Sequence, residues 1–158
     1  MYGEFAQKFQ IIVGHAMETG TLEKRIIIQK IAYLLYRKGV NFEYTDFSWY
    51  LHGIFSWNLW YDIIHFWDPA PQLLSTEQVA SVNNVLEDFK KANLTTYFTT
   101  SNDLELITTI LYRAKSQSDL NSENTSLINE VIALKGKFSQ EQIKIAIDKI
   151  KLIEWNFN

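Results

Sequence analysis

The sequence predicts a mainly α fold, a single compact helical domain of about seven helices with one short β element. Apolar residues recur at three- and four-residue spacing through most of the chain, which is typical of amphipathic helices. Ser75 and Ser139 each precede a glutamine by three positions, a pattern that marks helix starts. Only one segment, near Phe42, has the aromatic content typical of a strand. A chain of 158 residues is long enough to bury one core.

The first two predicted helices cover residues 3–18 and 21–38. Both ranges carry a broad apolar face at helical spacing. We expect Gly20 to end the first helix and Gly39 to end the second, because glycine readily adopts the left-handed conformation that closes a helix. Since a strand and a turn follow, the sequence is compatible with a winged-helix-like N-terminal half.

A short extended run is predicted next, over residues 42–51, and Gly53 is expected to break it. We expect Gly53 to be needed for its backbone, at a positive φ or at a close approach. Ser56 can then cap a helix over residues 57–67, because its hydroxyl can accept a hydrogen bond from an unpaired amide of the first turn.

Two prolines make residues 68–74 the clearest loop of the chain, and a flexible joint within the domain of residues 1–158 is expected there. Beyond it, residues 94–100 are expected to form an extended connector. Further helices are predicted over residues 76–91, 102–115, 125–135 and 140–155.

Composition excludes several kinds of chemistry. The chain has no cysteine, so disulfides, thiolate catalysis and cysteine metal sites are excluded. Its three histidines are scattered, and no phosphate loop, catalytic triad or metal motif is present, so we expect no enzyme, no metal and no cofactor. No apolar run resembles a signal peptide or approaches the roughly 20 residues of a membrane span. A cytoplasmic protein without a membrane partner is therefore expected.

Aromatic residues are concentrated between Phe42 and Trp67. Eleven of them lie there, including four of the five tryptophans. This exceeds what one strand and one helix need for a core, so some of the rings are expected to face a protein partner. No lysine or arginine occurs from Gly39 to Phe89, which disfavours a nucleic-acid backbone as that partner. The predicted partner-binding residues are His52, Gly53, Phe55, Ser56, Trp57 and Trp60.

Two of these residues have alternative interpretations. His52 could be an acid–base group or a donor to a ligand, or it could be a half-buried histidine bonded to a neighbouring carbonyl. Ser56 is most simply a helix cap, because no base or Gly-x-Ser-x-Gly context accompanies it.

Lys30, Tyr33 and Arg37 share one face of the second predicted helix. They could contact phosphates or an acidic partner, or form a solvated stripe. Lys30 could instead pair with an acidic residue across the fold, for which there are three candidates: Glu43, Asp46 and Asp62.

The chain also resembles a known family over residues 29–150. The positions that carry the resemblance are Lys30, Tyr33, Gly53, Phe55, Ser56, Leu59 and Asp62. They resemble the signature of the YwgA-like group of small bacterial and archaeal proteins, and the opening is similar to the Panacea antitoxin domain. Ile54 stands where these families have proline, so the turn is less rigidly set. Because Panacea domains neutralise toxins by binding them directly, the resemblance implies a binding function.

The sequence therefore favours a non-enzymatic protein-binding module, antitoxin-like or an adaptor, that acts through an aromatic-rich surface around residues 42–67. The alternative is a winged-helix-like DNA-binding transcription regulator, possible as a homodimer that presents the basic residues of the second helix. The missing positive charge counts against that alternative.

Overall fold

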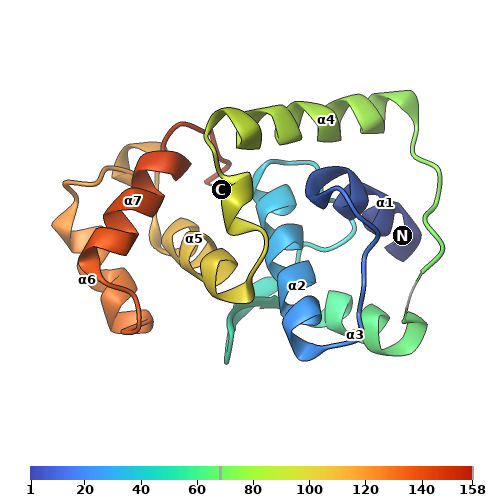
Figure 1. Cartoon of the computed structure of the whole chain (residues 1–158), viewed down its shortest axis with the longest axis horizontal. Coiled ribbons are helices and arrows are strands. Elements are labelled where there is room, and N and C mark those ends of the chain that lie inside the picture. Colours follow the sequence, from blue (N-terminus) through green and yellow to red (C-terminus); the bar gives the residue numbers. More distant parts are fainter. Residues whose placement is uncertain (68, 158) are drawn as a thin grey trace.

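The computed structural model describes residues 1–67 and 69–157, which form seven α-helices and one two-stranded antiparallel hairpin (Figure 1). This confirms the mainly α fold with one short β element. The helices are α1 (Tyr2–Val13), α2 (Leu22–Arg37), α3 (Trp57–Phe66), α4 (Thr76–Lys91), α5 (Ser101–Arg113), α6 (Thr125–Leu134) and α7 (Gln140–Ile150). The strands are β1 (Phe47–Tyr50) and β2 (Gly53–Ser56). The order of two helices and a hairpin agrees with a winged-helix-like N-terminal half, which otherwise stays a prediction.

The first helix is shorter than predicted. It ends at Val13 rather than near residue 18, because Gly14 takes a left-handed φ of 83° and its N–H closes the last turn on the carbonyl of Gln10. Gly20, the predicted stop, lies in the loop that follows. By contrast, α2 ends as expected beside Gly39, which has a φ of 74°.

Two other predicted segments differ from the structure. The expected extended connector contains a 3₁₀ turn at Thr95–Tyr97. The last helix ends at Ile150, because tight turns follow and the indole of Trp155 folds back to donate to the Ile150 carbonyl at 3.0 Å. Trp155 therefore packs into the core from outside the helix.

All seven helices contribute buried apolar residues to one continuous core. Helix α2 lies between α1 and α5, and packs against both of them and against β2 and α3 (Figure 1). The helices on either side of the proline-containing loop thus share one core. Of the predicted joint at residues 68–74, residue 68 lies outside the described residues. Within the rest, the N–H of Gln72 donates to the Gly3 carbonyl and Leu74 is buried.

The hairpin is short and closely held. Phe47 pairs with Ser56 at its open end, and Tyr50 pairs with Gly53 beside the turn. The hairpin packs on α2 and α5, where Trp49 stacks on Tyr112 with ring centroids 5.0 Å apart. Each helix in residues 1–67 and 69–157 is too short or too polar to span a bilayer.

A buried ion pair joins α1 to the segment before the hairpin. The Lys8 ammonium lies 2.9 Å from the Glu43 carboxylate and also donates to the Val40 carbonyl at 3.0 Å. Both charged side chains are almost completely inaccessible to solvent. Each charge therefore needs the other to offset the hydration that it loses on burial.

Replacing Lys8 by methionine is expected to lower the free energy of unfolding by about 3–5 kcal/mol, because it leaves the Glu43 carboxylate buried and unpaired. Urea denaturation measures this loss. The double variant Lys8→Met/Glu43→Leu should recover most of it. A loss below about 1 kcal/mol in the single variant would mean that the pair is hydrated in solution.

Candidate functional site

The hairpin is attached to α2 through backbone groups. Gln29 is buried and pairs with both main-chain groups of Ser56: its Nε2 donates to the Ser56 carbonyl at 3.0 Å, and its Oε1 accepts from the Ser56 N–H at 2.8 Å. The side-chain amide thus donates one hydrogen bond and accepts another, as the backbone of a neighbouring strand would. Gln29 thereby fixes the end of β2 on α2.

Lys30 is 1% exposed and lies beneath the turn of the hairpin. Its ammonium donates to the carbonyl oxygens of His52 and Ile54, at 2.8 Å in the second case. Gly53 lies between these two carbonyls with a φ of 93°, and a Cβ there would lie 3.2 Å from the Lys30 nitrogen. Position 53 therefore requires glycine for two reasons, its positive φ and the close approach of the Lys30 nitrogen.

The acidic partners considered for Lys30 are occupied elsewhere. Glu43 pairs with Lys8, Asp46 accepts from Ser56, and Asp62 accepts from Tyr44. The expectation that Lys30 anchors one of them is corrected: it binds two carbonyl oxygens instead.

Burial lowers the pKa of Lys30 to about 7, because the low-polarity surroundings disfavour its charged form. The negative charge of Glu105 opposes this shift, whereas Lys135 and Lys137 reinforce it. Glu105 is itself paired with both of these lysines, the bond to Lys137 being 2.7 Å. A neutral amine still has two N–H donors for the two carbonyls, so either protonation state can hold the turn.

Ser56 is the cap of α3, as the sequence predicts. Its hydroxyl accepts from the Leu59 N–H at 3.1 Å and donates to the Asp46 carboxylate at 2.5 Å. The second oxygen of Asp46 accepts from the Asn58 N–H at 3.1 Å. Asp46 thus extends the cap and places a negative charge at the helix N-terminus, where it is stabilising.

Four rings from the hairpin and α3 form a continuous group, called here the aromatic wall: Tyr50, Phe55, Trp57 and Trp60. Trp57 lies 4.9 Å from both Tyr50 and Phe55, and Trp60 lies 5.7 Å from Phe55, measured between ring centroids. The tilted and edge-to-face arrangements are those that aromatic pairs favour. These contacts between the rings stabilise the wall.

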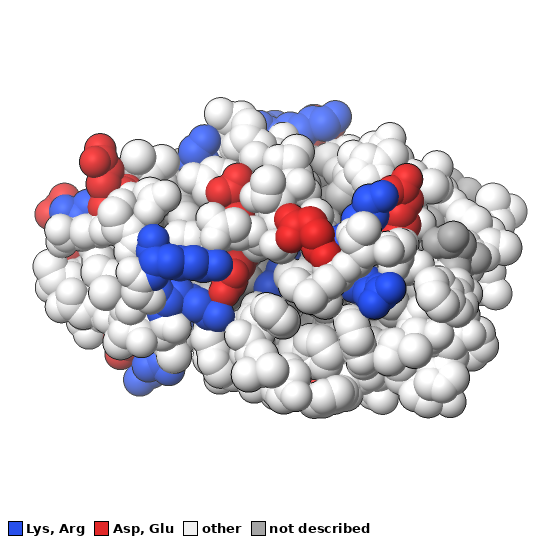
Figure 2. Space-filling view, turned by 60° about the horizontal axis from the view of Figure 1, so that its bottom comes forward, with Lys and Arg blue, Asp and Glu red and all other residues white. Residues whose placement is uncertain are grey.

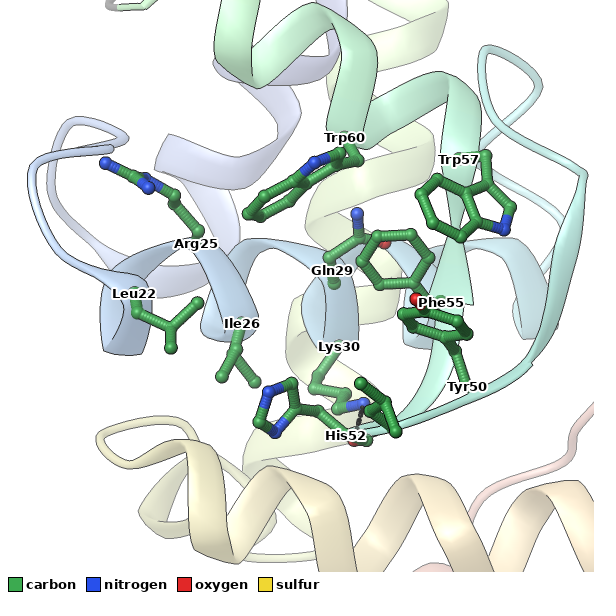
Figure 3. A pocket seen from close by; sticks show the side chains of 11 residues that line it. Leu22, Arg25, Ile26, Gln29, Lys30, Tyr50, His52, Phe55, Trp57 and Trp60 are labelled. Carbon is green, nitrogen blue, oxygen red and sulfur yellow. Dashed lines mark hydrogen bonds between the residues drawn. The ribbon is translucent and has the colours of Figure 1, made fainter.

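A cavity of about 250 Å³, called here the hairpin pocket, lies between this wall and α2 (Figure 3). Besides the wall, it is lined by Leu22, Arg25, Ile26, Gln29, Lys30, Leu51 and His52. Figure 3 shows Trp60 above α2, the other wall residues together at one end of the pocket, and His52 beside Ile26 and Lys30. Among residues 1–67 and 69–157, no aspartate or glutamate lines it.

Large apolar side chains are also exposed beside this pocket, on the hairpin and α3. They are Tyr50, Leu51, Trp57, Tyr61, Ile64, Phe66 and Trp67. Figure 2 turns this lower side of the molecule forward, and much of the lower right of the view is free of charged side chains. Exposed apolar residues gathered on one short helix and one hairpin are typical of an interaction surface.

The structure brings together four of the six predicted partner-binding residues around the pocket: His52, Phe55, Trp57 and Trp60. Lys30, of the predicted basic contact face, also lines it. The other two of the six, Gly53 and Ser56, are buried and shape the backbone. The side chain of His52 is exposed, and its carbonyl rather than its ring contacts Lys30.

Sequence reasoning missed the α2 side of the pocket. Leu22, Arg25, Ile26 and Gln29 lie at positions i, i+3, i+4 and i+7, so they share a helix face. That spacing was the available signal, but it does not indicate which face the hairpin leaves open.

The predicted basic contact face is corrected by burial. Lys30 and Tyr33 are buried, and Arg37 binds the Tyr33 hydroxyl at 2.5 Å, the Leu111 carbonyl at 3.0 Å and the Asn156 carbonyl at 2.7 Å. Arg37 ties α2 to α5 and to the C-terminal segment, whereas Lys30 holds the hairpin. The three side chains form neither an exposed contact face nor a solvated stripe.

No family model, curated protein or solved structure matches this chain. The resemblance to the YwgA-like group and to the Panacea domain therefore stays a prediction from the residues.

The lowered pKa of Lys30 predicts a pH-dependent stability. Between pH 7 and the ordinary pKa of 10.5, the unfolded chain binds a proton that the folded chain does not, so the free energy of unfolding should rise with pH. We expect a rise of about 2 kcal/mol from pH 7 to pH 9, relative to a Lys30→Met variant. Urea denaturation at both pH values tests this, and equal slopes in the two proteins would contradict it.

Proposed function

We propose that the chain is a non-enzymatic protein-binding module, an adaptor or an antitoxin-like protein, that binds its partner through the aromatic surface of the hairpin and α3. The observation that carries the proposal is the exposure of Trp57, Tyr61 and Trp67, each of which has more than half of its surface open to solvent. Tryptophan and tyrosine are the residues that most often dominate binding energy at protein interfaces.

The rigid support of this surface favours the proposal. Gln29 and Lys30 hold the hairpin through four hydrogen bonds to its backbone, and Ser56 with Asp46 caps α3. A surface that keeps its shape before binding loses little conformational entropy when a partner docks. Exposed rings on such a support are suited to contact a protein.

Electrostatics favours a protein over a nucleic acid. The segment from Gly39 to Phe89 has no lysine or arginine, so the aromatic surface lacks the residues that neutralise phosphates. The regulator alternative relied on the basic residues of α2, of which Lys30 is buried and Arg37 is engaged by the Leu111 carbonyl. No observation in the described part of the chain raises that alternative above the binding module.

The chemistry of the site also favours binding over catalysis. The Ser56 hydroxyl is engaged by Asp46 and by the first turn of α3, so it is held as a cap. His52 lies at the turn, and no bond from its ring to Ser56 occurs in residues 1–67 and 69–157. A nucleophile would need a base within hydrogen-bond distance.

The test is partner binding by surface variants. We expect Trp57→Ala to weaken binding of the partner captured from the native host by about 30-fold or more, the loss typical of an interface hot spot. His52→Ala should weaken it less, because this side chain lies at the edge of the surface. Binding is measured by calorimetry with the purified partner.

Leu152→Ala is the matched control, because Leu152 is as exposed as these rings but lies beyond α7. It should bind as the wild type does. Thermal unfolding must show that Trp57→Ala remains folded. A folded Trp57→Ala variant with unchanged affinity would refute the proposed surface, and an unfolded one would place Trp57 in the core.

A further inference from the structure

The hairpin pocket has the size of one side chain. Ligand pockets for drug-sized molecules usually exceed about 300 Å³, and an apolar cavity of about 150 Å³ already holds benzene. A cavity of about 250 Å³ therefore has room for one aromatic ring or branched aliphatic group with a short stem. This matches an anchor residue that projects from a larger partner.

The walls of the pocket are apolar on two sides. The aromatic wall covers one side, and Leu22 and Ile26 of α2 cover another (Figure 3). Gln29 turns its amide to the Ser56 backbone, so its polar atoms are already satisfied. An apolar anchor would lose its hydration here without leaving the Gln29 amide unpaired.

The polar lining of the pocket is cationic or neutral. Arg25 lies at one end, where its Nε donates to the Thr19 carbonyl at 2.8 Å, and Lys30 lies below the turn with two of three possible donors in use when charged. Neither side chain has an ion pair within the described residues. Since no described residue of the lining is a carboxylate, the Arg25 end of the pocket complements a negative charge.

We propose that the hairpin pocket receives one apolar side chain of the protein partner, with a carboxylate of the same segment placed beside it against Arg25. The partner would thus present a short acidic segment with an aromatic or aliphatic anchor. This inference rests on the proposed function and specifies what the partner offers. Hot-spot side chains that fill preformed pockets, flanked by complementary charges, are the usual arrangement at such interfaces.

Two blocked pentapeptides test the inference on the full chain. Both have a central phenylalanine, flanked on each side by aspartate in one and by lysine in the other. The indole N–H signals of Trp57 and Trp60 are followed by ¹H–¹⁵N NMR during titration. We expect the aspartate peptide to shift both signals and to bind at least about fivefold more tightly than the lysine peptide, the effect of one partly exposed charge pair.

Arg25→Gln should remove most of that preference, and Arg113→Gln is the matched control. Arg113 is a partly exposed arginine on α5 that does not line the pocket, so its replacement should leave both titrations unchanged. Equal binding of the two peptides, tighter binding of the lysine peptide, or no shift with either would overturn the inference. So would a preference that survives in Arg25→Gln.

Two further measurements identify other occupants. Tryptophan shifts that depend on protein concentration, with a doubled mass in light scattering, would show that a second copy fills the pocket. Binding of 3-phenylpropionate as tight as that of the aspartate peptide would show a small-molecule site. Either result overturns the partner segment as occupant. Failure here is separable from failure of the proposed function, because the Trp57→Ala binding test does not depend on the charge of the peptide.

Discussion

The hydrogen bonds from α2 to the backbone of the hairpin are the constraint on which the site depends. A two-stranded hairpin alone is marginally stable in water, and this one has strands of only four residues. Gln29 and Lys30 satisfy the carbonyls of His52, Ile54 and Ser56 from adjacent buried positions of α2. The position of the aromatic wall and the opening of the pocket follow from that attachment.

Placing Lys30 in this position has an energetic cost. A buried ammonium without a carboxylate in contact is destabilising, and its lowered pKa expresses that cost. The two carbonyls offset it, since without a donor they would be buried and unpaired beneath the turn. The same helix thus contributes apolar residues to the core and polar ones to the hairpin, and a change at position 30 would disturb both.

Much of the architecture could be predicted from the sequence, because its signals are local. The capping boxes at Ser75 and Ser139 and the cap at Ser56 are present in the structure. Gly14 was not recognised as the end of α1, because a glycine at a helical spacing does not reveal its φ. The predicted helix of residues 140–155 exceeds α7 for a similar reason: Ile153 keeps the apolar spacing while the chain already turns.

The site could be predicted only in part. The aromatic segment indicated one wall, but burial of Lys30, Tyr33 and Arg37 depends on contacts with the hairpin, α5 and the C-terminal segment. These contacts join residues that are far apart in the sequence. The attachment of the hairpin to α2 also affects its turn. Because Lys30 binds main-chain oxygens, the conformation of the turn does not depend on the side chains at positions 51 and 52. Related chains could vary these two residues, and so change partner preference, without rebuilding the scaffold that presents them.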